Sequence, residues 1–299
     1  MNWLHAVGRA AVRALYAEIS LEPKPGLVSF RDTGSHCDMD ASTFMRSLFS
    51  LRHYFPAMAQ AGYHAARFDT LQSLGLQAEA RMLMATGGIN THRGAVFGLG
   101  LLCASAGQVR AQGLTLTPHH LRTVLLATWG QALAERAEAA SACAPRSHGQ
   151  TVARRYGLRS AGAEAALGFP CLLDITWPSL QQALATGLGE RAARVHALFA
   201  TIAVLDDTNL VHRGGMPGLR LAQGLARQFL AAGGSFQPHW VSHARSVHAT
   251  FVQHRLSPGG AADVLASACW MQSMCQSAPL LRAPVERVCL DTQKRLCLG

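Results

Sequence analysis

A lysine between two prolines is the feature of this chain that most directly suggests chemistry. Lys24 follows Pro23 and precedes Pro25 and Gly26. Proline fixes its own φ and keeps the residue before it extended, so this segment is predicted to be a loop rather than a helix. Only two of the 27 basic residues are lysines, and a compact ammonium binds a phosphate oxygen as a point charge, whereas arginine presents a planar fork. We therefore predict that Lys24 binds phosphate, against the alternative of an ordinary turn with a solvated lysine.

Carboxylates are scarce and are concentrated beside glycine-rich or kinked segments. Of the 17 acidic residues, eight lie in such segments: Glu22, Asp32, Asp38, Asp40, Glu79, Glu164, Asp206 and Asp207. Each alone could instead cap a helix or close a turn. Together they indicate an acidic pocket for a hard cation, because Mg²⁺ prefers oxygen ligands and keeps water or substrate phosphate as the others. Four of them are the candidate Mg²⁺ ligands: Asp38, Asp40, Asp206 and Asp207. A zinc site at His36 and Cys37 is less favoured, because no His/Cys framework of recognisable spacing supports it.

The segment 87–94 has the sequence Gly-Gly-Ile-Asn-Thr-His-Arg-Gly and leads directly into an apolar stretch. Its amides and the N-terminus of the following helix could cradle phosphate oxygens. The candidate substrate-binding side chains are Asn90, Thr91, His92 and Arg93. A helix-to-helix turn capped by Asn90 or Thr91 is the alternative.

The segment 206–215 repeats this chemistry. It combines two carboxylates, an amide, a histidine and an arginine with two glycines that would let a ligand approach the backbone. Asn209 and Arg213 are its candidate substrate-binding groups. Upstream, Glu79 precedes Thr86 by seven residues, or two helical turns, so both are predicted to face the glycine-rich loop that follows.

The elements that must position these residues are predicted to be helices. Hydrophobic residues make up 49% of the chain and aromatic residues only 7%, with alanine and leucine prominent, which favours helices over sheets. The helices are predicted over residues 3–20, 41–66 with a kink or break at Pro56, 71–85, 95–106, 118–140, 178–205, 219–232, 238–255 and 258–274. A polar connection is predicted over 142–155. We predict one all-α domain over residues 1–299, a multi-helix bundle with the site built from loops between helices, because no repeat or composition break divides the chain.

The charge and the cysteines limit the class of protein. A net charge of +10 raises the alternative of a nucleic-acid-binding protein, but the arginines form no cluster, so polyanionic small molecules are the predicted partners. The eight cysteines occur without a CxxC pair, which indicates reduced thiols and a cytoplasmic location. The longest apolar run, 95–107, is too short to span a bilayer, and the first residues do not form a secretory signal. No membrane partner is therefore expected.

Several of these motifs recur in a fixed order over about the whole chain. They lie at 23–28, 34–36, 38–40, 85–94, 156–157, Glu164, 168–170, 207–209, 213–215 and 256–263. Taken together and in this order, the motifs resemble those of the triphosphoribosyl-dephospho-coenzyme A synthase family. Citrate-lyase-type members usually have Asp where this chain has Ser29, so the chain is more similar to the malonate decarboxylase branch. The basic residue expected just before Glu164 is absent, and Arg159 is the residue that could replace it.

The resemblance implies a transferase that converts ATP and 3′-dephospho-coenzyme A into 2′-(5″-triphosphoribosyl)-3′-dephospho-coenzyme A, with release of adenine. The product would pass to a holo-acyl-carrier-protein synthase as the prosthetic-group precursor of the malonate decarboxylase acyl carrier protein. Ribosyl transfer passes through an oxocarbenium-like state and needs an acid for the departing base. The candidate roles are phosphate binding by Lys24, Arg93 and Arg213, Mg²⁺ binding by the four aspartates, and proton transfer by Glu79 or His36. A homo-oligomer is compatible with this assignment.

Two other functions fit the residues without the resemblance. A Mg²⁺-dependent hydrolase with an all-α acidic pocket could cleave a nucleotide or an ADP-ribosyl bond. A basic nucleic-acid-binding protein would show affinity that falls steeply with salt. Product analysis separates the first from a transferase, which yields adenine without free ribose triphosphate.

Overall fold

The structure is a computed structural model that describes residues 3–142 and 148–275, and helices are the only regular secondary structure in these ranges. In chain order the elements are α1 (Trp3–Ile19), α2 (Ala41–Ser50), α3 (Tyr54–Tyr63), α4 (Phe68–Thr86), α5 (Arg93–Ala111), α6 (Pro118–Ala142), α7 (His148–Tyr156), α8 (Ala161–Ala166), the π-helix η1 (Cys171–Thr176), α9 (Trp177–Ala185), α10 (Glu190–Ile202), α11 (Thr208–Ala231), the 3₁₀-helix η2 (Gly234–Phe236), α12 (Trp240–Gln253) and α13 (Gly259–Met274). The all-α prediction is confirmed.

Several boundaries differ from the prediction for local reasons. The helix predicted over 41–66 breaks at Leu51 rather than at Pro56, which lies in the first turn of α3, where its missing N–H costs no intrahelical bond. The helix predicted over 178–205 is divided into α9 and α10. The polar connection predicted over 142–155 is wrong in its second half, where α7 begins at His148.

The segment 206–215 is mostly helical rather than a loop. Asp207 caps α11, which begins at Thr208, eleven residues before the predicted start at 219. The predicted glycine pair, Gly214 and Gly215, lies at a kink in this helix, where Gly215 has the non-helical angles φ 62° and ψ −170°. The polar groups of the segment therefore lie on the first turns of a helix and are held more rigidly than loop residues.

α5 is the most completely buried long helix of the described part. It spans 19 residues and, by length and composition alone, is apolar enough to cross a membrane, which corrects the argument that its apolar run is too short. However, 67% of the 18-residue apolar stretch on which this rests is buried inside the structure. The backbones of α3 and α5 approach each other closely. A Cβ at Gly62 would lie 2.7 Å from Ala104 Cα, and one at Gly107 would lie 2.7 Å from Tyr63 N. These two glycines permit a close helix pair.

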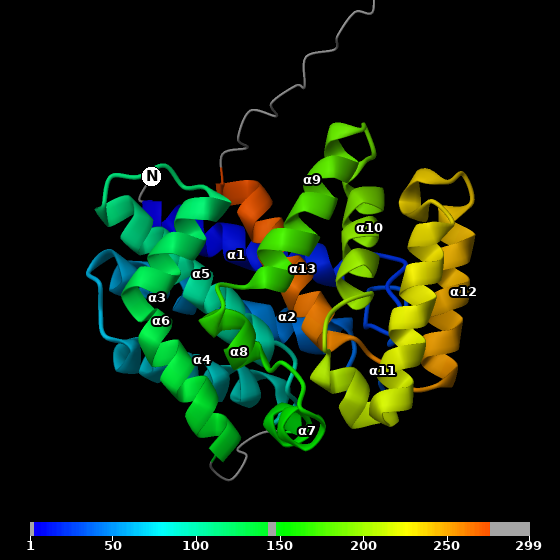
Figure 1. The fold of residues 1–299 in the computed structure, drawn as a ribbon, viewed down its shortest axis with the longest axis horizontal. Helices are drawn as coiled ribbons and strands as arrows, with labels where there is room; N and C mark the ends of the chain where they lie inside the picture. The colour runs from blue at the N-terminus through cyan, green and yellow to red at the C-terminus, as the bar shows by residue number, and fades with distance from the viewer. Residues whose placement is uncertain (1–2, 143–147, 276–299) are drawn as a thin grey trace, which may run out of the picture.

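α13 runs through the middle of the molecule, between the group α3–α6 and the group α9–α12 (Figure 1). It packs against α1, α5, α10, α11 and η1. The N-terminus of α13 therefore lies where helices from both halves of the chain meet. The prediction of free thiols is confirmed for five cysteines, Cys37, Cys103, Cys171, Cys269 and Cys275, whereas Cys143, Cys289 and Cys297 lie outside the described residues.

Candidate active site

The segment 256–263, which runs from the connection after α12 into the first turn of α13, contacts the predicted site segments one after another. At its start, Ser35 Oγ donates a hydrogen bond of 2.6 Å to the Leu256 carbonyl. One residue further, Ser257 Oγ lies 2.9 Å from His36 Nε2. These two contacts fix the proline-framed loop at the N-terminal end of α13.

His36 forms a polar cluster with two other predicted residues. Arg213 Nη2 lies 2.9 Å from His36 Nδ1, and Arg213 Nη1 donates to the Ser35 carbonyl at 2.9 Å. Burial and the charge of Arg213 lower the pKa of His36, while Asp38, 3.4 Å away, raises it. A guanidinium can only donate, so the contact with Arg213 favours a neutral imidazole with its proton on Nε2, beside Ser257 Oγ. The Asp38 carboxylate, 3.4 Å from the same Nδ1, can only accept and favours the other tautomer.

Asp207 ties the start of α11 to the start of α13. Its Oδ1 accepts from the Asn209 N–H at 2.9 Å, and its Oδ2 accepts from the Ala261 N–H at 3.0 Å. The residue is only 2% exposed. Burial raises the pKa of Asp207, whereas the hydrogen bonds from the amide donors lower it. Both carboxylate oxygens are thus occupied by amides, while the neighbouring Asn209 is exposed.

Asp263 lies against the first turn of α5. A Cβ at Gly94 would overlap its Oδ2 and would lie 2.9 Å from its Cγ, so the carboxylate occupies the space of a side chain at that position. Burial raises the pKa of Asp263 well above its usual value, the charges of Glu18 and Asp207 add to the rise, and the Ala95 N–H opposes it. This shift favours the protonated form of the carboxyl.

Lys24 is buried and paired. Its side chain is 1% exposed, and Nζ lies 2.6 Å from Glu18 Oε1 and donates to the Glu18 carbonyl at 2.8 Å. Burial lowers the pKa of Lys24 and the Glu18 carboxylate raises it. The ammonium therefore has protein partners and would have to exchange them to contact a phosphate.

The loop before α5 holds its polar groups in two ways. Asn90 Oδ1 accepts from the Arg93 N–H at 3.3 Å, which is the cap that the alternative interpretation allowed. The Arg93 side chain forms an ion pair with Glu79 of α4, so the structure brings these two predicted residues together. Both side chains remain partly exposed, at 39% and 24%.

Thr91 and His92 face inwards. Thr91 Oγ1 donates to Ser47 Oγ at 2.6 Å. Ser47 Oγ in turn lies 2.6 Å from His92 Nδ1. Burial, with a contribution from the charge of Lys24, lowers the pKa of His92 to about 3, so this imidazole is neutral at physiological pH. Its Nε2 is buried and has no hydrogen-bond partner in the described part of the chain.

The four predicted Mg²⁺ ligands lie at two helix starts. Asp40 caps α2 with a capping box that lowers its pKa to about 2, and Asp207 caps α11. Asp206 accepts from the Arg159 N–H at 3.3 Å, and the Asp38 side chain is 55% exposed. Within residues 3–142 and 148–275, no three His, Cys, Asp or Glu side chains are close enough to hold a metal ion by themselves.

Arg159 supplies the basic contact that the motif around Glu164 lacks. Its Nη1 donates to Glu164 Oε1 at 2.9 Å, and the other carboxylate oxygen accepts from the Cys171 N–H at 3.1 Å. The structure thus brings Arg159, the residue that the sequence offered as a replacement, into contact with Glu164, and its role as the replacement stays a prediction.

Sequence reasoning missed two carboxylates of this site. Asp263 lies in the last motif, so its position in 256–263 was the available signal, but no role was assigned to it. Glu18 had no such signal, because it falls on an amphipathic helix where a charged residue is usually solvated, and only the structure shows it 4% exposed. Sequence reasoning also missed the basic side chains that contact Glu22, Arg191 and Arg245.

Comparisons of the sequence with known proteins point to one family. The sequence model described as ATP:dephospho-CoA triphosphoribosyl transferase matches residues 5–280. Among curated proteins, the chain is similar to a probable 2-(5″-triphosphoribosyl)-3′-dephosphocoenzyme-A synthase of Acinetobacter calcoaceticus, 42% identical over 84% of this chain and 85% of the relative. A probable synthase of Azotobacter vinelandii is 39% identical over 92% of each chain, and a synthase of Pectobacterium atrosepticum is 36% identical over 87% of this chain and 86% of its own. No solved structure matches the chain.

Proposed function

The chain belongs to the ATP:dephospho-CoA triphosphoribosyl transferase family, and we infer from this that the cluster around residues 256–263 is the active site of a triphosphoribosyl-dephospho-coenzyme A synthase. The observation that carries the proposal is the convergence of the separate motif segments on the N-terminal end of α13. In the reaction, the bond between adenine and C1 of the ATP ribose breaks, and C1 bonds to the 2′-oxygen of dephospho-coenzyme A.

Two proton transfers balance this reaction. The acceptor hydroxyl loses a proton to a base, and the departing adenine takes one from an acid. We propose His36 as the base, because its low pKa keeps the imidazole neutral, and Nδ1 is freed as an acceptor when Arg213 turns to a substrate phosphate. Asp263 is the proposed acid because its raised pKa favours the protonated carboxyl, with Glu79 as the second candidate.

Mg²⁺ is proposed to enter with the triphosphate. A nucleotide-bound Mg²⁺ commonly uses only one or two protein carboxylates, with phosphates and water as the remaining ligands. Asp38 and Asp206 fit this role best, because the amide bonds of Asp207 and the capping bonds of Asp40 would have to break first. When bound, the ion would neutralise phosphate charge. Full activity in excess EDTA would contradict this assignment.

The function is tested by incubating the protein with ATP, Mg²⁺ and dephospho-coenzyme A and measuring adenine by mass spectrometry. Adenine is expected only when both substrates are present. Coenzyme A should be a much poorer acceptor, by at least about tenfold in kcat/KM, because its 3′-phosphate must lose water beside a carboxylate-lined site.

The controls separate the alternatives. Adenine release with ATP alone, together with free ribose triphosphate, would identify a hydrolase instead. Equal kcat/KM values for coenzyme A and its dephospho form would show that the acceptor ribose is not recognised at the reacting end.

We propose that the product serves a malonate decarboxylase through a holo-acyl-carrier-protein synthase, on the ground of Ser29 in the first motif. A cytoplasmic location is proposed from the free thiols of the described part. Deleting the gene should leave the malonate decarboxylase acyl carrier protein without its prosthetic group. The intact mass of the carrier measures this, and an unchanged mass would contradict the malonate assignment.

A further inference from the structure

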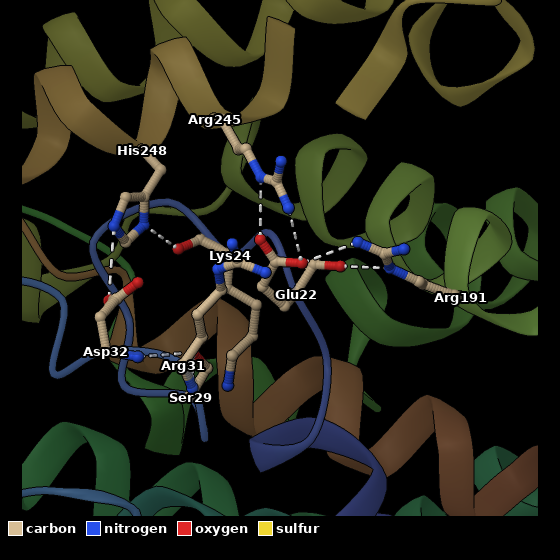
Figure 2. Close-up of polar contacts among 8 residues, drawn as sticks. All are labelled: Glu22, Lys24, Ser29, Arg31, Asp32, Arg191, Arg245 and His248. Carbon is tan, nitrogen blue, oxygen red and sulfur yellow. Dashed lines mark hydrogen bonds and ion pairs between the residues drawn. The ribbon is translucent and has the colours of Figure 1, made fainter. Parts of the chain in front are cut away.

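A pocket of about 250 Å³ lies on the outer side of the proline-framed loop and is separate from the His36 cluster in its lining. Figure 2 shows Arg245 and His248 projecting from α12, and Arg191 from α10, towards the loop that carries Glu22 and Asp32. Lys24, Arg31 and Arg245 line the pocket with these two carboxylates, and His248 lines it as well. Three cationic side chains therefore face two anionic ones around it.

Glu22 holds two of the guanidiniums in place. Arg191 Nη2 lies 2.7 Å from Glu22 Oε2, and Arg191 Nε donates to the Glu22 carbonyl at 2.6 Å. Arg245 Nε donates to Glu22 Oε1 at 3.1 Å. The two arginine side chains are still 52% and 47% exposed, so several of their five N–H donors face solvent.

Arg31 differs from the other arginines of the pocket. Its backbone is fixed, because its N–H donates to Ser29 Oγ at 3.1 Å. Its guanidinium is exposed, and its charge helps to lower the pKa of Glu22 without a hydrogen bond or ion pair that would hold it there within the described residues. A fixed backbone with an available guanidinium is suited to closing on an anion.

The predicted phosphate cations are in a different situation. Lys24 is paired with Glu18, and Arg93 with Glu79. Arg213 donates to the Ser35 carbonyl. Among the described cations next to the first motif, Arg31 can thus bind a phosphate without breaking a hydrogen bond or ion pair of its side chain.

The size of the pocket indicates which part of a ligand it takes. Pockets that enclose drug-sized ligands span roughly 300–1,000 Å³. A volume of about 250 Å³ suits a multiply charged chain of phosphates better than a whole nucleotide. The loop that forms one wall continues to Ser35 and His36, which contact the 256–263 segment.

We propose that this pocket binds the polyphosphate chain of a substrate, with Arg31 and Arg245 as direct ligands and Glu22 as the residue that orients Arg191 and Arg245. The assignment to a substrate rests on the proposed function. The chain can be the triphosphate of ATP or the diphosphate of dephospho-coenzyme A.

The test uses inorganic tripolyphosphate and pyrophosphate as probes, with binding measured by calorimetry on the full chain. Arg31→Gln and Arg245→Gln should each weaken binding about tenfold or more, because each removes charge-assisted hydrogen bonds. Arg31→Lys should retain part of the affinity. Asp32→Asn should strengthen binding, since it removes a negative charge at the pocket but keeps an oxygen for the Gly34 N–H. Arg67→Gln is the matched control, an 89% exposed arginine on another face that should bind as the unmodified protein does.

Steady-state kinetics distinguish the two sources. A raised KM for ATP alone in Arg31→Gln assigns the pocket to the triphosphate, and a raised KM for dephospho-coenzyme A alone assigns it to the diphosphate. Unchanged probe binding and unchanged KM values in both glutamine variants, with normal adenine release, would overturn the pocket and leave the function standing. Absence of adenine release by the unmodified protein would instead overturn the function, whatever the probes show.

Discussion

Replacing Lys24 by methionine is expected to lower the free energy of unfolding by about 3–5 kcal/mol, because it leaves the Glu18 carboxylate buried without its counter-ion. The lysine and glutamate side chains are 1% and 5% exposed, so solvent screens the pair little. From the sequence alone, Lys24 is expected to act mainly on turnover through a phosphate. The structure adds a folding role that would dominate in an equilibrium denaturation experiment.

A double-mutant cycle isolates the pair. Glu18→Gln should also destabilise, and the Lys24→Met/Glu18→Gln double variant should lose less than the sum of the two single losses. Arg67→Met serves as the comparison, since Arg67 and Asp69 are 89% and 81% exposed and should change stability by no more than about 0.5 kcal/mol. Unchanged stability in Lys24→Met with loss of adenine release would favour the ligand role over the structural one.

Gly94→Ala is expected to reduce adenine formation by about a hundredfold, the order of loss that follows from displacing a site group by about 1 Å. The new Cβ would overlap Asp263 Oδ2 and would lie 2.9 Å from Cγ, so either the carboxyl moves or α5 and α13 separate. Both outcomes disturb the contact between the 85–94 and 256–263 motifs. The measurement is kcat for adenine release together with the unfolding midpoint.

Gly98→Ala is the matched control, one helical turn further along α5. Its Cβ would lie 3.9 Å from the nearest atom, a ring carbon of Phe169, so activity should be retained and stability should rise by up to about 1 kcal/mol. Adding Asp263→Ala to Gly94→Ala should recover packing without recovering activity. Full activity in Gly94→Ala would show that Asp263 has no fixed role at the start of α5.

The fold class was predictable because apolar spacing along the chain follows the helical period. The boundaries of the helices were less predictable. The helix ends at Leu51, which is fully buried, and not at the proline five residues later, which fits the first turn of α3. The start of α11 at Thr208 depends on a cap by Asp207, a residue that the sequence also offered as a metal ligand.

The site was predictable where its residues belong to the recognised motifs, as His36 and Arg213 illustrate across 177 residues, and where helical spacing turns a residue towards a motif, as Glu79 illustrates with Arg93. The cations around Glu22 were not predictable, because Arg191 and Arg245, 169 and 223 residues from Glu22, lie outside every motif. Their positions follow from how α10 and α12 pack, and nothing in the local sequence marks them. Glu18 was missed because its partner, Lys24, enters its environment only when the loop folds back on α1.

The glycines of α3 and α5 have a consequence for how this sequence can evolve. A side chain at Gly62 or Gly107 would meet backbone atoms, which no neighbouring substitution can remove. A side chain at Gly94 would meet the carboxylate of Asp263, which a second substitution can shorten. Within a lineage, positions 62 and 107 are each closed to single changes, whereas position 94 can change only once position 263 has been shortened, and this pair of changes would replace a functional group by a packed interface.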